Sequence, residues 1–192
     1  MPTPNPAALA FLLARRSRPA KTLGLPVPER AELIPILTAA ARSPDHGKLE
    51  PWRFVVLSKP ALNRLAALAE TRATELGLDA DRAAKGISQF AQSNLAIAVI
   101  ASPVISDKVP PIEQTLSTGA VCLALTNAAE AAGWGANWLT GWPAHDRGFV
   151  EPGLSLAPHE FVAGFIHLGS ETSAPPERPR PDLGRITTWA NE

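Results

Sequence analysis

The sequence predicts a single globular domain that contains both helices and strands. With 192 residues and 45% apolar content, the chain is long enough to bury one core and too short for two. Some segments repeat apolar residues at helical spacing, whereas others are short aromatic or β-branched runs of strand length. We therefore expect one domain over residues 1–192, with a proline-rich C-terminal arm from about residue 173.

The first helix is expected to begin at Pro6, with Asn5 as its N-cap, and to end near Arg15 and Arg16. Arginines at the end of a helix also complement its dipole, so a purely structural role for Arg16 is an equal alternative. A connector with two prolines and a glycine then leads to a second helix over residues 28–42.

A polar loop separates this second helix from the first clear strand, Trp52 to Leu57. Pro44, Gly47 and Pro51 interrupt regular structure in this loop. Charged or titratable side chains gather within nine residues, namely Arg42, Asp45, His46, Lys48 and Glu50. A solvated surface loop is the simpler interpretation of this stretch taken alone.

The middle of the chain alternates helix, strand and helix. Helices are predicted from Ser58 to Gly77 and from Asp79 to Gln92, and the second is the more polar. The almost wholly apolar run Leu95 to Ala101 is typical of a strand buried on both faces. Residues 112–132 form the longest helix, whose small residues require close approach of another surface, such as a second subunit. Cys122 within it is interpreted as a small apolar residue.

The last third of the chain contains two further candidate strands and the arm. The run Trp134 to Trp142 combines glycine with three tryptophans, which suits a strand end beside a flat ligand, with buried core tryptophan as the alternative. Phe161 to Gly169 is the last predicted strand, and His167 is interpreted as a core or edge histidine. The prolines after Ser173 argue against a helix or central strand, so the arm is expected to wrap across another surface.

Composition excludes several classes of function. The 18 basic and 18 acidic residues cancel, so no global positive field indicates nucleic acid or an anionic membrane as the partner. Rossmann and P-loop motifs are missing, and the four histidines show no metal-binding spacing. A single cysteine, and an N-terminal apolar run without preceding basic residues, favour a cytoplasmic protein. If the protein is an enzyme, a cofactor carries the chemistry.

Several segments, in the right order, resemble the nitroreductase family of flavin enzymes, and most closely its short bacterial NAD(P)H nitroreductases. These segments are RRS at 15–17, AARSPDHGKLEPWRFVVL at 40–57, the long small-residue helix, GWGANWLTG and FIHLG. The resemblance implies an α+β fold of three layers, in which a mixed, mainly antiparallel sheet is flanked by helices. It further implies an intertwined homodimer with FMN bound at the subunit interface.

By this resemblance, the phosphate and ribityl side of FMN is contacted by Arg15, Arg16 and Ser17. A phosphate dianion needs charge-assisted donors, and arginine presents a planar fork of them. The resemblance also implies that Arg42 and His46 reach the flavin from the partner subunit.

The same resemblance places Trp138, Leu139 and Thr140 along the isoalloxazine ring, where backbone amides can bond its polar edge. Residues 128–133 would lie near the nicotinamide nucleotide. No side chain is expected to be an indispensable acid or base in flavin reduction, because hydride passes directly between stacked rings.

Three positions depart from the family pattern. Pro19, Lys48 and Glu50 stand where many members have a basic residue, an asparagine and a glutamine. An ionised Glu50 can accept a hydrogen bond from the flavin N3 proton but cannot donate one to a flavin carbonyl. Arginines of the arm could supply missing charge, although solvated surface arginines are the simpler interpretation: Arg178, Arg180 and Arg185.

The resemblance implies an FMN-dependent oxidoreductase that takes hydride from NADPH or NADH. It would then reduce nitroaromatics, quinones or similar flat acceptors in a ping-pong order. The alternative is a flavin-binding or flavin-sensing protein with little turnover, because binding motifs do not guarantee catalysis. A related flavin chemistry, such as fragmentation of FMN or dehalogenation, is a third possibility.

Overall fold

The computed structural model describes residues 3–190, which form seven helices and five strands. The helices are α1 Pro6–Ala14, α2 Arg30–Ala40, α3 Lys59–Glu75, α4 Ala80–Ala91, α5 Pro111–Ala131, α6 Arg147–Leu154 and α7 Leu183–Ile186. The strands are β1 Leu23–Gly24, β2 Trp52–Ser58, β3 Leu95–Ala101, β4 Gly135–Leu139 and β5 Phe161–Glu171. Three short 3-10 turns are η1 Ala20–Thr22, η2 His46–Lys48 and η3 Trp142–Ala144.

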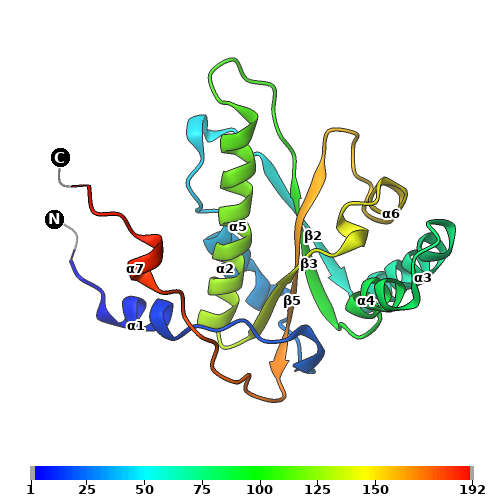
Figure 1. Ribbon diagram of the computed structural model, residues 1–192, viewed down its shortest axis with the longest axis horizontal. Coiled ribbons are helices and arrows are strands. Elements are labelled where there is room, and N and C mark those ends of the chain that lie inside the picture. The colour runs from blue at the N-terminus through cyan, green and yellow to red at the C-terminus, as the bar shows by residue number, and fades with distance from the viewer. Residues whose placement is uncertain (1–2, 191–192) are drawn as a thin grey trace.

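The elements form three layers with the sheet in the middle (Figure 1). The strand order is β1-β5-β3-β2, and β4 also pairs with β5. All pairings recorded within residues 3–190 are antiparallel, which confirms the predicted α+β class and its mainly antiparallel sheet. One apolar core lies between the sheet and α3, α4 and α6, and a second lies between the sheet and α2 and α5.

Most predicted elements are confirmed, and local signals explain their ends. Asn5 caps α1 by accepting a hydrogen bond from Ala8 N at 3.0 Å, and Asp79 caps α4 through Arg82 N at 2.9 Å. Every residue of β3 is buried, because helices cover both faces of the sheet there.

Two elements differ from the prediction. Helix α6 was not predicted, because two glycines and a proline interrupt its short sequence; it forms because Phe149 and Val150 pack into the core. Helix α7 contradicts the expectation that the arm has no helix. It begins after the last proline of the arm, and Asp182 caps it by accepting a hydrogen bond from Gly184 N at 2.9 Å.

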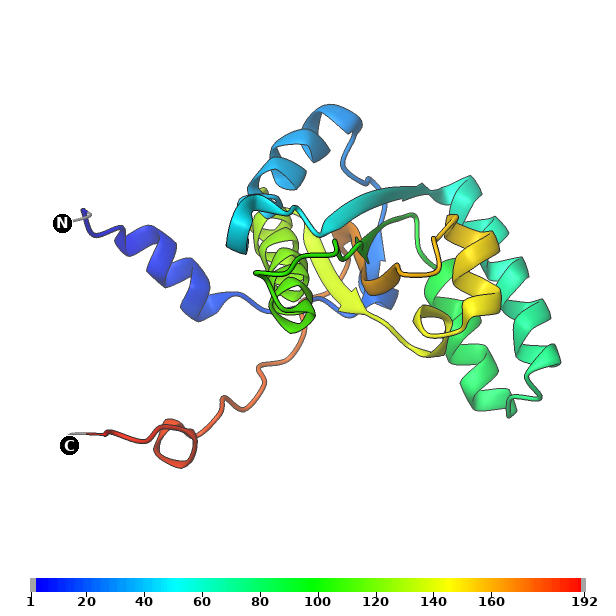
Figure 2. The ribbon, with the colours of Figure 1, turned by 90° about the horizontal axis from the view of Figure 1, so that it is seen from above.

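Helix α1 and the arm project away from the three layers (Figures 1 and 2). Although α1 is strongly apolar, it contains no buried residue. Its leucines Leu9, Leu12 and Leu13 are 59%, 55% and 70% exposed. Within residues 3–190, no helix combines the length and apolar character needed to cross a membrane.

The ion pair between Arg53 and Glu160 ties β2 to the start of β5. Both oxygens of Glu160 accept from the Arg53 guanidinium at 2.7 Å, and the carboxylate also accepts from Ala157 N at 3.0 Å. The hydrogen bond from Arg53 lowers the pKa of Glu160 from 4.5 to about 2.

This pair predicts a pH-dependent part of the stability. Since the unfolded carboxyl protonates near pH 4.5 and the folded one near pH 2, the stabilisation is present above about pH 4.5 and is lost as the pH falls to about 2. Glu160→Gln should lower the free energy of unfolding by about 2 kcal/mol at pH 7. Urea unfolding at pH 7 and pH 3 should therefore show a smaller acid-induced loss in this variant than in the wild type.

The control is Glu151→Gln, which breaks the exposed Arg147–Glu151 pair within α6. A surface pair at this spacing contributes little, so this variant should keep the wild-type pH dependence. An equal acid-induced loss of stability in Glu160→Gln and the wild type would contradict the assignment.

Candidate functional site

Residues 15–21 connect α1 to the sheet and border two separate cavities. Backbone and side-chain hydrogen bonds fix this segment beside β4. Arg18 N donates to Ala136 O at 2.8 Å, and Asn137 Nδ2 donates to Arg18 O at 2.6 Å. The guanidinium of Arg18 also pairs with Glu171 at the end of β5, with 2.5 Å between Nε and Oε2.

The first cavity, of about 300 Å³, is called here the arginine cavity. Its lining consists of Arg15, Arg16, Ser17 and the arm residues Arg178, Pro179, Arg180 and Pro181. Arg16 Nη2 donates to Pro176 O at 3.1 Å and so attaches the arm to the segment. Arg16 Nε is buried and has no hydrogen-bond partner among the described residues. Four cations and an unpaired buried donor fit an anionic group such as a phosphate.

The second cavity, of about 630 Å³, is called here the α4 cavity because α4 forms one of its walls. Leu139, Thr140 and the two residues that follow them form the other wall. Among the described residues, the lining contains three cations and no carboxylate. The cations are Lys21, Arg82 and Lys85. Its volume is in the range of small-molecule sites, and its charge favours an electron-rich ligand.

Trp142 forms a wall of the α4 cavity through a close contact with α4. Its Nε1 donates to Arg82 O at 3.0 Å, and its ring meets Phe149 edge-on at a centroid distance of 6.3 Å. A Cβ atom at Gly86 would lie 2.0 Å from this Nε1. A side chain at position 86 would therefore displace the indole, so the shape of the cavity depends on glycine there.

Ser93 lines the α4 cavity, and its hydroxyl forms a hydrogen bond with the buried His167. Ser93 Oγ and His167 Nδ1 are 2.9 Å apart, and both residues are buried. Burial lowers the pKa of His167 to about 4, so the ring is neutral at pH 7. Of the two predicted alternatives for His167, core or edge, the structure shows the core position.

Trp138 lines neither cavity, although its neighbour Leu139 does. Side chains alternate across a strand, so these two residues face opposite sides of β4. The Trp138 indole lies against Gly164, where an added Cβ would be 2.1 Å from Nε1, and Nε1 donates to Ala163 O at 3.1 Å. The indole is thus fixed, with 40% of the residue exposed.

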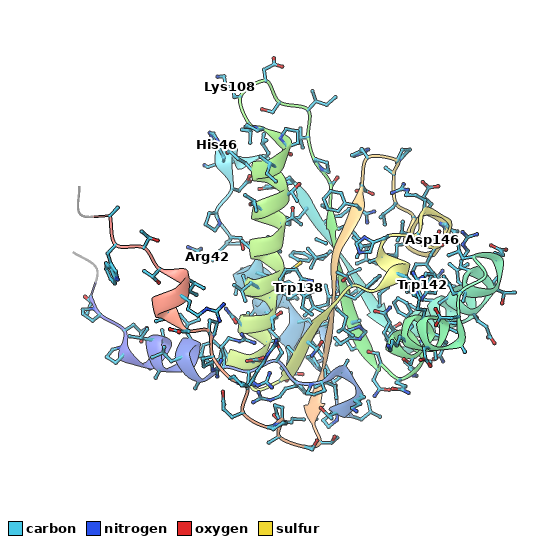
Figure 3. All side chains as sticks on the ribbon, in the orientation of Figure 1. Arg42, His46, Lys108, Trp138, Trp142 and Asp146 are labelled. Atoms are coloured by element: carbon cyan, nitrogen blue, oxygen red, sulfur yellow. The ribbon has the colours of Figure 1, made fainter. Side chains whose placement is uncertain are left out.

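Arg42 and His46 lie on the side of α5 away from Trp142 (Figure 3). His46 Nδ1 is 2.7 Å from Oε2 of Glu113 at the start of α5, and both side chains are largely exposed. Lys48 and Glu50 have positive φ angles of 54° and 48°, which bend the loop sharply. Within one chain, Arg42 and His46 line neither cavity. The cavities are lined by five other residues that the resemblance assigns to FMN: Arg15, Arg16, Ser17, Leu139 and Thr140.

Sequence reasoning missed the contribution of α4. Polar residues of α4 and of its C-cap line the cavity at spacings of three and four, and this spacing was the available signal: Arg82, Lys85, Ser88, Gln89 and Gln92. Arg178 and Arg180 are exposed, as expected for solvated surface arginines, and they also line the arginine cavity.

The two cavities suit the two ends of one FMN molecule. Only two residues separate Ser17, at the first cavity, from Ala20, at the second, so three peptide steps keep their Cα atoms at most about 11 Å apart. The arginine cavity fits a phosphate, and the α4 cavity has apolar walls and a cationic lining for a flat polar ring.

Among the described residues, neither a metal-binding group nor a free thiol lines these cavities. Within residues 3–190, no group of three or more His, Cys, Asp or Glu is arranged to hold a metal ion. Cys122 is buried in α5, and burial raises the pKa of its thiol to about 12, so it remains protonated at pH 7.

Comparison with known proteins gives concordant matches. A model of the Nitroreductase family matches residues 14–170. An Escherichia coli (strain K12) protein named "Putative NAD(P)H nitroreductase YdjA" is 32% identical over 163 residues, which cover 85% of this chain and 87% of that protein.

Solved structures share the fold. A nitroreductase-like family protein from Bacillus cereus superposes with a TM-score of 0.80 at 22% identity over 100% of both chains. A Desulfovibrio desulfuricans protein, described as a "putative nitroreductase in complex with FMN", superposes with a TM-score of 0.74 at 20% identity over 98% of both chains.

Proposed function

The chain belongs to the Nitroreductase family, and from this premise we propose that it is an oxidoreductase that binds FMN and takes hydride from NADPH or NADH. The observation that carries the proposal is the pair of cavities bordered by residues 15–21. The E. coli relative is named as an NAD(P)H nitroreductase, and the D. desulfuricans protein is described in complex with FMN, which supports both cofactors.

The arginine cavity holds the phosphate in this proposal. Arg15, Arg16 and Ser17 donate from the segment, and Arg178 and Arg180 add charge from the arm. The arm arginines compensate for Pro19, which stands where many family members have a basic residue. Charge-assisted contacts of this kind contribute about 1.5–3 kcal/mol each.

The α4 cavity holds the isoalloxazine ring, with Leu139 and Thr140 along it and Trp142 as a wall. When bound, FMN supplies a ring that accepts hydride at N5 and passes electrons on to a flat acceptor, such as a nitroaromatic or quinone. The cations Lys21, Arg82 and Lys85 favour the electron-rich reduced ring. The protein therefore supplies position and charge, and it needs no catalytic acid or base in hydride transfer.

The chain is proposed to work as a homodimer, with Arg42 and His46 reaching the flavin of the partner subunit. The exposed apolar residues of α1 support this, because a nine-residue helix with no buried residue is not stable by itself. Helix α5 adds Ile112, Leu116 and Leu123, which are 60%, 66% and 49% exposed. The exposed arm after Ser173 would wrap across the second subunit.

We predict that the protein sediments as a dimer at low micromolar concentration, and that Leu13→Asp converts it to monomer with loss of FMN. The reason is that a charge would enter the apolar surface of α1. Leu76→Asp, at the exposed C-cap leucine that follows α3, is the control and should leave the dimer intact. A stable wild-type monomer loaded with FMN would contradict the shared site.

The purified protein should be yellow with the absorption spectrum of FMN. Arg15→Ala should weaken FMN binding about 30-fold, since loss of a charged contact costs about 2 kcal/mol. The control is Arg30→Ala, which removes an exposed arginine at the start of α2. A wild-type protein that stays colourless in the presence of added FMN would refute the proposed function.

An oxidoreductase would transfer electrons from the nucleotide to an acceptor in repeated cycles, whereas a flavin-sensing protein would do so little or not at all. NADPH or NADH should bleach the bound flavin anaerobically, and a nitroaromatic or quinone should restore its colour. Because nucleotide and acceptor are proposed to share one open face of the ring, double-reciprocal plots should be parallel, and intersecting lines would contradict the ping-pong order. Bound FMN that neither nucleotide reduces would favour the sensing role.

A further inference from the structure

Glu130 is an acidic residue in the last turn of α5, close to a site that is proposed to receive an anion. Its side chain is only 7% exposed. A carboxylate at a helix C-terminus meets the negative end of the helix dipole, and burial adds a cost of desolvation. A partner must compensate for both.

The compensating partner is Arg15. Arg15 Nε and Nη2 lie 3.4 and 3.5 Å from the two oxygens of Glu130, so the guanidinium faces the carboxylate with one edge. The same Nη2 lies 3.2 Å from Ser17 Oγ, which belongs to the arginine cavity. Glu130 itself does not line that cavity.

The remaining donor of Arg15 is available for a ligand. A guanidinium carries five N–H groups on three nitrogens. Nε and Nη2 are engaged as described, whereas Nη1 has no hydrogen-bond partner among residues 3–190 and is not among their buried unpartnered atoms. Arg15 also lines the arginine cavity, so Nη1 is the nitrogen left to bind there.

We propose that Glu130 is a positioning residue that fixes the guanidinium of Arg15 for recognition of the FMN phosphate. This inference rests on the proposed function, and it goes beyond it by assigning a role in phosphate recognition to a residue that does not line the arginine cavity. A free arginine side chain loses rotamer entropy when it binds, and one already held by Glu130 and Ser17 loses less. Glu130 thus raises the preference for FMN over riboflavin, which has the same ring but no phosphate.

The test measures the dissociation constants of apo-protein for FMN and riboflavin by flavin fluorescence quenching. The wild type should prefer FMN, and Glu130→Gln should reduce that preference about tenfold, equal to about 1.4 kcal/mol, with riboflavin binding changed less than about twofold. Glu130→Asp, which retains the charge but shortens the side chain, should also reduce the preference, because the position of the carboxylate is what matters. If Glu130→Gln fails to fold, the FMN-to-riboflavin preference of Glu130→Asp tests the proposal instead.

A matched control separates positioning from general support of the segment. Glu171→Gln removes the acidic partner of Arg18, an arginine of the same segment that lines neither cavity. Any effect of this variant should weaken FMN and riboflavin together. In an Arg15→Ala background, Glu130→Gln should leave the FMN-to-riboflavin ratio unchanged, because its only route to the phosphate has been removed.

The inference is overturned if wild-type protein prefers FMN and Glu130→Gln keeps that preference. It is also overturned if the variant binds FMN more tightly, since the carboxylate would then act only by repelling the phosphate. A wild type that does not bind FMN overturns the proposed function itself, and the inference with it.

Discussion

The candidate site depends on the attachment of residues 15–21 to β4. Two hydrogen bonds between Arg18 and the strand, with the Arg18–Glu171 pair, hold the segment against the sheet. The segment presents arginines at its beginning and Lys21 at its end, so one short stretch of chain serves two cavities of different chemistry. β5 stabilises this arrangement, because it pairs with β4 and also carries Glu171.

The two sides of the molecule differ in how well apolar residues are covered. On the face covered by α4, Leu139, Ser93 and Trp142 line a cavity that adjoins the apolar core, because Trp142 packs against that core. On the other side of the molecule, α1, part of α5 and the arm expose apolar residues that one chain leaves uncovered. Arg42 and His46 lie on the side of α5 away from Trp142 (Figure 3), and the proposed dimer would bring them to the flavin of the partner subunit.

Sequence reasoning succeeded where local signals agree with packing, as in the Asn5 cap of α1 and the strand Leu95–Ala101. The resemblance also directed attention to Arg15, Arg16 and Ser17, which the structure brings into one cavity. Helix α6 was missed because it depends on tertiary packing of Phe149 and Val150 rather than on local propensity. The cations of α4 were missed because only the sheet topology brings that helix to Leu139.

The most direct test of the account is a crystal structure of the protein grown with FMN. The phosphate should lie in the arginine cavity, within hydrogen-bond distance of Arg15 and at least one arm arginine, and the isoalloxazine ring should lie in the α4 cavity beside Leu139 and Thr140. A flavin bound with its phosphate away from Arg15 and Arg16, or with its ring outside the α4 cavity, would contradict it.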